Sequence, residues 1–423
     1  MSFRFTLPSR FLSTVWTVLC IGLLNSSFAA EAPTKPVPHP NGVYKPSGIA
    51  LKEQPIVIPP PPTLDAQSYI LIDATSGKVL VEKNSNTRMA PASLTKIMTA
   101  YILFDALKTG QVKMTDQVQI STKAWRTGGS RMFVQAGSLV NIEDLLQGIV
   151  VQSGNDACVA VSEHLAGSEE SFTHIMNQQA ANLGMTNTHF TDSTGLPDPN
   201  HHSSAADLAK LARAMIAHYP EYYHYFSQKW FTYNKIKQNN RNRLLWLDPR
   251  VDGLKTGFTD DAGYCLAAAA KQNNMRLISI VLGSSSPNQR TEQTEQLLNY
   301  GFSFYDTYTI YSAGKTLVNP RTWGGQQKNT AFGIAHDIII TIPKNEYKNL
   351  QTSLSLKNEI EPPIVKGQQY GKVTVTLNGE KIAEQPLIAL HDNPKGGVWR
   401  RFKDYSAKTY QSWTSDDEEA AAK

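Results

Sequence analysis

The sequence predicts an α+β protein of several domains that ends in a separate helix. Its 423 residues exceed the length of one average domain. Residues 64–307 alternate long apolar helical stretches with runs of β-type residues, whereas residues 308–392 contain only short strand-like runs. Residues 396–415 return to a helical period. We therefore expect an α+β domain, then a small all-β sandwich domain, then a C-terminal amphipathic helix.

The first 29 residues have the layout of a signal peptide. Arg4 and Arg10 provide the positive beginning, and the apolar stretch at 11–24 is too short to span a bilayer comfortably. Small residues precede a cleavage point after Ala29. We expect the protein to be exported.

Composition restricts the partners and the redox chemistry. Residues 30–63 contain ten prolines, which predicts an extended linker without a packed core. The net charge of +5 is spread along the chain, and no basic stretch is interleaved with aromatic residues, so we expect no nucleic-acid partner. Export would allow a disulfide between Cys158 and Cys265. Both lie among apolar residues, so two buried free thiols are an equal alternative.

Strand and helix patterns alternate within the first domain. Residues 68–81 predict a hairpin. A proline followed by a nearly all-apolar run predicts a buried helix from Ser93 to about Leu107, which Gly110 ends. Further helices are expected at 142–151, 157–165, 171–183, 205–217 and 289–300. Strands are expected at 229–236, 244–247, 252–257, 264–270 and 277–283.

The C-terminal part changes from alternating runs to a helix. Residues 337–342 and 371–377 alternate as strands of the sandwich, and an Asn-Gly turn follows the second run. One side of the final helix carries Trp399, Phe402, Tyr410 and Trp413. An aromatic face with basic flanks is typical of a helix that lies in a membrane surface, and packing against the sandwich is the alternative. Residues 416–423 form an acidic tail.

Three short motifs carry the candidate chemistry. They are Ser93-x-x-Lys96 at a helix start, Ser153-Gly154-Asn155 at a turn between helices, and Lys255-Thr256-Gly257 beside a strand. A lysine three residues after a serine shares its helical face and, once desolvated, can act as the base that activates the hydroxyl. The first motif alone is a weak signal, but the ordered set of three is strong.

The residue types predict acyl transfer. Ser93 is the expected nucleophile, and Ser153 can relay its proton to the leaving amine. Asn155 can hold the substrate amide and the lysine, while Lys255 adds positive potential and Thr256 can bind a substrate carboxylate.

An oxyanion hole is expected beside the nucleophile. It would be formed by the backbone N–H groups of Ser93 and of Phe258. Gly257 would leave space for the substrate along the strand.

The sequence resembles a known family through residues 91–96 (PASLTK), 152–158 (QSGNDAC) and 252–257 (DGLKTG). These motifs are similar to those of the low-molecular-mass penicillin-binding proteins, the D-alanyl-D-alanine carboxypeptidases of the penicillin-binding protein 5 type. The resemblance implies helices packed against a five-stranded antiparallel sheet, as in serine β-lactamases. It also implies removal of the terminal D-alanine from peptidoglycan pentapeptides and covalent reaction with β-lactams, without a cofactor. Arg290 resembles an arginine near the substrate carboxylate, with a surface helix charge as the alternative.

The resemblance extends to location. It implies a peripheral protein on the periplasmic face of the bacterial inner membrane, attached through residues 396–415. Two features depart from the pattern: the linker is unusually rich in proline, and Phe258 stands where histidine is usual. Because only the backbone of this residue is needed for the oxyanion hole, we expect activity to survive, with an altered rate or substrate preference.

Three other functions compete with this prediction. A class A-like β-lactamase needs a glutamate that directs water onto the acyl-enzyme, but residues 171–220 contain none. A DD-endopeptidase usually lacks the β-domain and the anchor. A non-enzymatic wall-binding protein would not require all the motif residues. No metal is expected, since His201 and His202 lie in a loop without matching ligands, where solvent-exposed histidines are common.

Overall fold

The computed structural model describes residues 58–357 and 360–407. Three predicted segments lie wholly or partly outside the described residues. They are the signal peptide at 1–29, residues 30–57 of the linker predicted at 30–63, and the acidic tail at 416–423. The same holds for the predicted final helix beyond residue 407.

A five-stranded antiparallel sheet organises the first domain, as the resemblance implied. Its strand order is β2-β1-β9-β8-β7, so β7 is an edge strand that pairs only with β8. The central strands β8 and β9 are buried along most of their length because both faces of the sheet are covered. The strands are β1 Ser68–Asp73, β2 Val79–Lys83, β7 Val251–Thr259, β8 Gly263–Gln272 and β9 Met275–Ser284.

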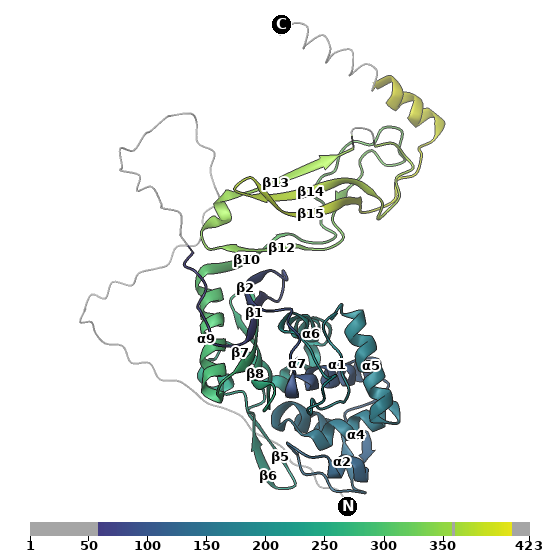
Figure 1. Ribbon diagram of the computed structural model, residues 1–423. Helices are drawn as coiled ribbons and strands as arrows, with labels where there is room; N and C mark the ends of the chain where they lie inside the picture. The colour runs from purple at the N-terminus through teal and green to yellow at the C-terminus, as the bar shows by residue number, and fades with distance from the viewer. Residues whose placement is uncertain (1–57, 358–359, 408–423) are drawn as a thin grey trace, which may run out of the picture. The chain divides into compact units, whose positions relative to one another are not determined.

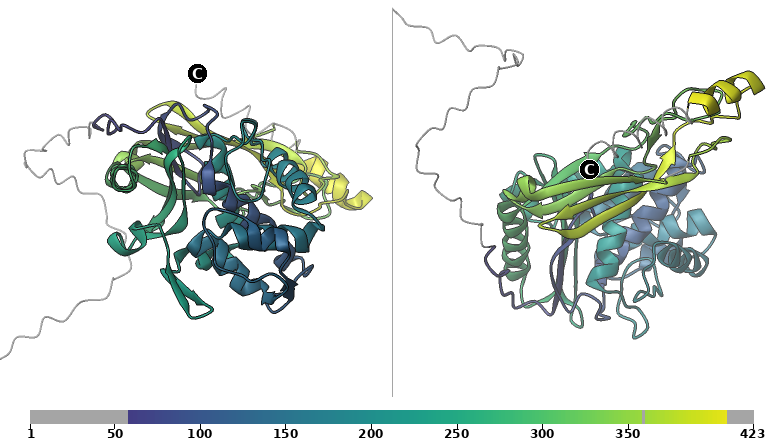
Figure 2. Two further views of the ribbon diagram at one scale, coloured as in Figure 1. Left: turned by 60° about the horizontal axis from the view of Figure 1, so that its bottom comes forward. Right: turned by 90° about the horizontal axis from the view of Figure 1, so that it is seen from above.

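Helices cover the two faces of this sheet. Figure 1 shows α9, Pro287–Phe304, on one side of the sheet and the other long helices on the opposite side, and Figure 2 shows the same layers from above. Each face therefore has its own apolar core. Helix α1, Lys96–Lys108, is buried nearly all round, as its apolar run predicts. The other long helices on that side are α4 Asn155–Ala166, α5 Glu169–Asn182 and α6 Ala205–His218.

Short elements connect the long ones. They are η1 Ala92–Thr95, β3 Gln117–Gln119, α2 Thr122–Arg126, β4 Leu139–Asn141, α3 Ile142–Gln147, the π-helix η2 Gly148–Gln152, α7 Pro220–Tyr223 and η3 His224–Ser227. Ser and Asn side chains cap α2, α3, α5, α6 and α9, which explains why these helices begin where they do.

One strand prediction in this domain is wrong, and another is right only in part. Residues 244–247 form the short helix α8, Leu244–Leu247, because the Asn242 side chain accepts the backbone N–H of Leu244 and starts a helical turn. The run at 229–236 is divided by a turn, which gives the hairpin of β5 Trp230–Tyr233 and β6 Ile236–Asn239. A short apolar run cannot distinguish a strand from a helix by its period alone.

The second half contains two small sheets around one core. Strand β10, Tyr305–Tyr311, follows α9 directly and pairs with β12, Ile338–Pro343. The other sheet has the order β11-β15-β14-β13. Phe332, Val373 and Val375 lie in the common apolar core. The remaining elements are β11 Phe332–Gly333, η4 Glu346–Asn349, β13 Leu350–Leu356, β14 Gln369–Leu377 and β15 Glu380–Ala389.

The described part of the predicted final helix spans residues 398–407. Its side chains are largely exposed, including Trp399 and Phe402, which are 81% and 64% exposed. Asp404 ties the helix to a loop of the β-rich part by accepting from Arg321 at 2.9 Å and from the Gly324 N–H at 3.0 Å. Within residues 58–357 and 360–407, no helix has the length and apolar character that a bilayer span requires.

Candidate active site

The nucleophile candidate sits on the turn that leads into α1. Ser93 belongs to η1 and is partly exposed, whereas Lys96 is the first residue of α1 and only 1% exposed. The Lys96 Nζ lies 2.9 Å from the Ser93 Oγ and donates to the Thr194 carbonyl at 2.6 Å. The structure thus joins the two residues of the first motif in a direct hydrogen bond.

Burial makes Lys96 a candidate base. Desolvation lowers the pKa of its ammonium group, and the positive charge of Arg241 lowers it further. Cys158, Asp192 and Asp156 act in the opposite direction, but the net pKa shift is downward. A neutral amine that donates to the Thr194 carbonyl keeps its lone pair for the Ser93 hydroxyl proton.

Ser153 directly follows the π-helix η2. Its backbone is left-handed, with φ at 68°, a conformation that costs a non-glycine residue about 1 kcal/mol or more. Its side chain is 2% exposed, and its Oγ has no hydrogen-bond partner among the described residues. A strained residue with an unpaired buried hydroxyl is what a proton relay awaiting its substrate would show.

Asn155 differs in part from its expected role. It begins α4 and is 4% exposed, but its Nδ2 donates to the Gly128 carbonyl at 2.7 Å rather than to Lys96. Its backbone N–H also bonds to the neighbouring loop, at the Ser130 carbonyl, 2.7 Å away. The side chain therefore fastens the 127–130 loop to the site and leaves its amide oxygen for other partners.

The third motif lies on the edge strand β7. A Cβ built on Gly257 would stand 3.1 Å from the backbone nitrogen of Ser93, so only glycine lets the strand pass this close to the nucleophile. Lys255 and Thr256 are 2% and 5% exposed. Burial lowers the pKa of Lys255 well below its usual range, and the charges of Lys96 and Arg241 add to this effect.

Phe258 follows the glycine, so its backbone comes next to the Ser93 segment. Its ring is 48% exposed and stacks on Tyr264 of β8 with a centroid distance of 4.3 Å. The two residues are direct partners in the sheet register. The backbone position agrees with a role in an oxyanion hole, while the side chain remains available to solvent or substrate.

Arg290 of α9 is not a surface charge. It is 8% exposed, and its Nη1 donates to the Gly257 carbonyl at 3.1 Å and to the Cys265 carbonyl at 3.3 Å. Its guanidinium also lies 5.6 Å from the centre of the Tyr264 ring. Arg290 therefore contacts strand β7 from the side of the sheet that α9 covers, and its hydrogen bond helps to hold Gly257 in position. Binding of a substrate carboxylate by Arg290 stays a prediction.

Two contributors were missed at the sequence level. Thr194 supplies a carbonyl to Lys96 from a loop that carries no motif. Arg241 lies in a polar turn, yet its charge influences Lys96, Lys255 and Arg290. Only the local composition of these segments was available from the sequence, and it indicated ordinary loops.

The expectation of an exposed His201 is wrong. This histidine is 3% exposed, and its Nε2 lies 2.8 Å from the Thr95 Oγ1. Its other ring nitrogen lies 3.6 Å from Asp192, whose pKa is lowered by its hydrogen bonds against the effect of burial. Asp192 also accepts the N–H groups of Thr194 and Gly195. This network holds the Thr194 loop against the start of α1.

The two cysteines are buried free thiols, which decides between the two alternatives. Burial raises the pKa of Cys158 to about 12 and that of Cys265 to about 11, so both are protonated at neutral pH. Within residues 58–357 and 360–407, no three His, Cys, Asp or Glu side chains converge to hold a metal ion.

Known protein families match both halves of the chain. Residues 56–286 match the D-alanyl-D-alanine carboxypeptidase family, and residues 305–395 match the C-terminal domain of penicillin-binding protein 5. A D-alanyl-D-alanine carboxypeptidase of Escherichia coli strain K12, DacC, is 43% identical over 83% of this chain and 90% of its own length. The DacF carboxypeptidase of Bacillus subtilis is 39% identical over 83% of this chain and 90% of its own length.

Solved structures show the same likeness. Penicillin-binding protein 5 of Haemophilus influenzae superposes with a TM-score of 0.76 and 41% identity, over 79% of this chain and 99% of its own. Penicillin-binding protein D2 of Listeria monocytogenes, in its ampicillin-bound form, superposes with a TM-score of 0.53 and 31% identity, over 57% of this chain and all of its own.

Proposed function

Since the chain belongs to the D-alanyl-D-alanine carboxypeptidase family, we propose that its Ser93 is the nucleophile that removes the terminal D-alanine of peptidoglycan pentapeptides. The observation that carries this assignment is the 2.9 Å contact between the Ser93 Oγ and the Nζ of the buried Lys96. The contact pairs a partly exposed hydroxyl with an amine whose pKa is lowered by desolvation. This is the arrangement that an activated serine requires.

Acylation begins when neutral Lys96 takes the Ser93 proton. The Ser93 Oγ attacks the carbonyl carbon of the penultimate D-alanine, and the carbonyl oxygen becomes an oxyanion. The backbone N–H groups of Ser93 and Phe258 stabilise this oxyanion, and one such donor contributes about 3 kcal/mol. The C-terminal carboxylate of the substrate is bound by Thr256 and by the positive potential of Arg241 and Arg290, and this carboxylate in turn favours the charged form of Lys255.

Collapse of the tetrahedral intermediate breaks the peptide bond. The unpaired hydroxyl of Ser153 passes the proton from Lys96 to the departing D-alanine amine, while the Asn155 amide oxygen orients the substrate amide. A water molecule then attacks the ester carbonyl on Ser93 while Lys96 accepts the water proton, and this proton passes to the Ser93 Oγ as the ester bond breaks. The products are the shortened peptide and free D-alanine.

β-Lactams acylate Ser93 in the same way, but the resulting acyl-enzyme is hydrolysed slowly. One glutamate, Glu169, contacts the loop that faces Lys96: its Oε1 accepts the Ser193 hydroxyl at 2.7 Å, and its Oε2 pairs with Lys123 at 3.1 Å. That carboxylate is occupied in holding the loop, so it does not activate water as a β-lactamase requires. We expect a penicilloyl-enzyme that persists for minutes. Turnover of many penicillin molecules per second would contradict this expectation.

The direct test measures D-alanine released from a pentapeptide. Wild-type protein should release it, and Ser93→Ala should release less than a thousandth as much. Mass spectrometry after incubation with penicillin should add one ligand to wild type and none to the variant. Equal release by both proteins would contradict the assignment of Ser93.

Membrane attachment is the second part of the proposal. The helix at 398–407 exposes Val398, Trp399 and Phe402 next to Arg400 and Arg401, which favours a position in the headgroup region of an anionic membrane. Together with the predicted signal peptide at 1–29, this supports a location at the periplasmic face of the inner membrane. Deletion of residues 396–423 should move it to the soluble fraction. A deletion variant that still sediments with membranes would exclude the helix as the anchor.

A further inference from the structure

A cavity of about 820 Å³ lies between the final helix and loops of the β-rich part. Its volume is within the range of sites that bind small molecules. The helix contributes Val398 and Phe402 to its wall, and the loop before β11 contributes Arg321 and Trp323. None of these residues belongs to the site around the nucleophile.

The frame of the cavity is fixed by backbone pairing. Residues 324–326 and 394–396 meet in an antiparallel bridge, with backbone hydrogen bonds of 2.7 and 2.9 Å. The side chain of Asn393 is fully buried and binds the Gln327 backbone twice, accepting from its N–H at 2.8 Å and donating to its carbonyl at 3.1 Å. Asp404 fastens the helix to the same loop. The cavity is therefore formed before anything binds in it.

The charge around the cavity is mainly positive. Four cationic side chains line it, against the single carboxylate of Glu361; they are Arg321, Lys357, Lys395 and Arg401. Arg321 is neutralised by its ion pair with the helix. Within the described part of the chain, neither Lys395 nor Arg401 has an ion pair. The cavity therefore attracts an anionic group.

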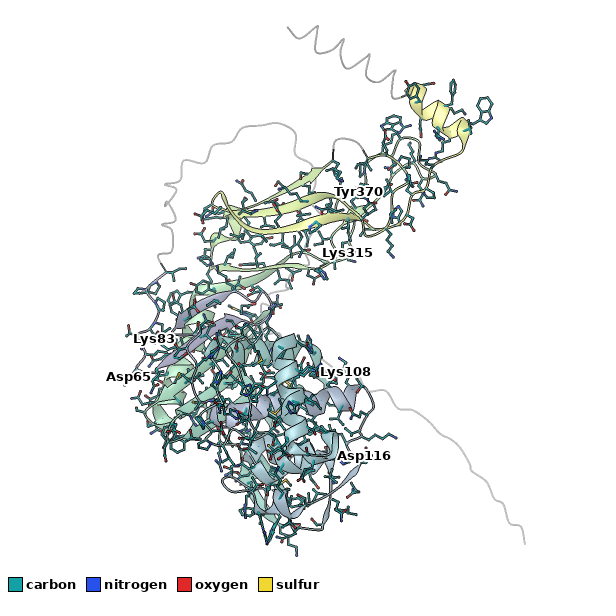
Figure 3. The ribbon with its side chains drawn as sticks, turned by 45° about the vertical axis from the view of Figure 1, so that its right-hand side comes forward. Asp65, Lys83, Lys108, Asp116, Lys315 and Tyr370 are labelled. Atoms are coloured by element: carbon teal, nitrogen blue, oxygen red, sulfur yellow. The ribbon has the colours of Figure 1, made fainter. Side chains whose placement is uncertain are left out.

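Figure 3 labels Tyr370, whose ring lies 6.0 Å from the Nζ of Lys357 at the edge of this cavity. Tyr370 belongs to the β-rich part, so the positive lining comes from that part as well as from the helix.

Part of the wall is apolar and left uncovered. Val398 and Phe402 are about one helical turn apart and share one side of the helix. They line the cavity, yet they are 79% and 64% exposed. The Trp323 ring is held in place by the Arg321 guanidinium, 3.7 Å from its centre. Apolar surface beside cations fits an amphiphile that has an alkyl chain and an anionic head.

The setting of the cavity favours a membrane lipid over a dissolved anion. Trp399 does not line the cavity and is 81% exposed, so the same helix presents a second aromatic side to its surroundings. A helix with this side in the headgroup region brings the mouth of the cavity to the bilayer surface. A lipid could then enter without leaving the membrane.

We propose that this cavity binds one anionic phospholipid, with Lys395 and Arg401 on the phosphate and with Trp323 and Phe402 on the first part of an acyl chain. The inference rests on the membrane attachment proposed above and adds to it a defined site that includes the β-rich part. Attachment by the helix alone needs only an anionic surface, whereas this site selects a headgroup.

The experiment titrates the chain from residue 30 to 423 with short-chain lipids below their micelle concentration, in a calorimeter. The probes are dihexanoyl phosphatidylglycerol and dihexanoyl phosphatidylcholine, with glycerol phosphate as the free anion. Phosphatidylglycerol should bind one-to-one, and each of the other two should bind at least about tenfold more weakly. Lys395→Gln with Arg401→Gln should weaken its binding about 20-fold, since each nearby cation contributes about fivefold. Phe402→Ser should weaken it severalfold without unfolding an exposed position.

A matched control removes the same charge from the helix outside the cavity. Arg400→Gln with Lys403→Gln should keep the affinity within about twofold, because neither residue lines the site. D-Alanine release should be unchanged in every variant. Equal affinity for the two lipids would overturn the site, as would equal losses in the two double variants or glycerol phosphate binding as tightly as the lipid. The proposed attachment fails separately, if the protein without residues 396–423 still sediments with membranes.

Discussion

Substitution of Gly257 by alanine tests the geometry of the oxyanion hole without removing any functional group. The added Cβ would stand 3.1 Å from the Ser93 nitrogen, from the Pro91 carbonyl oxygen and from the Ala92 Cβ. These contacts are tighter than ordinary van der Waals separation, and two of the three neighbours are backbone atoms that cannot rotate away. The strand and the nucleophile turn must therefore separate by a few tenths of an ångström.

That separation acts on catalysis more than on folding. Residue 257 does not have a positive φ, so alanine brings no backbone strain of its own. Overpacking of this size costs about 1 kcal/mol of folding free energy. Misplacing one oxyanion donor costs about 100-fold in kcat, or about 2.7 kcal/mol of transition-state stabilisation. We therefore expect a folded protein with kcat reduced about 100-fold and KM changed less than threefold.

The assay follows D-alanine release under saturating substrate, with thermal unfolding recorded on the same samples. Gly397→Ala is the matched control, because a Cβ at that position meets nothing within 4 Å. A Gly257→Ala protein that unfolds like wild type and retains more than a third of its kcat would refute the oxyanion-hole reasoning.

Three further perturbations follow from the site. Arg241→Gln removes a charge that lowers the pKa of Lys96, so the acid limb of kcat/KM should move to higher pH, since neutral Lys96 is the active form. Asp192→Asn removes a charge that raises the same pKa, so the limb should move to lower pH; shifts in the same direction would contradict the role of Lys96. Gly195→Ala places a Cβ in direct collision with the Ala92 carbonyl oxygen at a residue with φ at 84°, so thermal unfolding should show a loss of at least about 2 kcal/mol. An unchanged Tm would show that the loop around Gly195 is not held against the nucleophile turn.

Sequence patterns predicted the main elements where long-range packing agrees with local preference. The apolar run after Ser93 predicts α1 correctly. A helix that is buried on every face requires apolar residues all round, and this run supplies them. The short run at 244–247 was different, since four apolar residues fit a strand or a helix turn equally well, and Asn242 decides between them. The prediction for residues 244–247 therefore failed because the choice between strand and helix depends on one side chain that lies outside those four residues.

The chain by itself determined which groups can react. The motifs at Ser93, Ser153 and Lys255 predict a nucleophile, a proton relay and a source of positive potential, and their resemblance to one family indicates the reaction. Only the tertiary structure decided how these groups are tuned. Burial lowers the pKa of Lys96, the Thr194 carbonyl orients its amine, and the Arg241 charge reaches it from a distant turn. Desolvation and electrostatic potential depend on every segment packed around a group, so no spacing of residues along the chain can specify them.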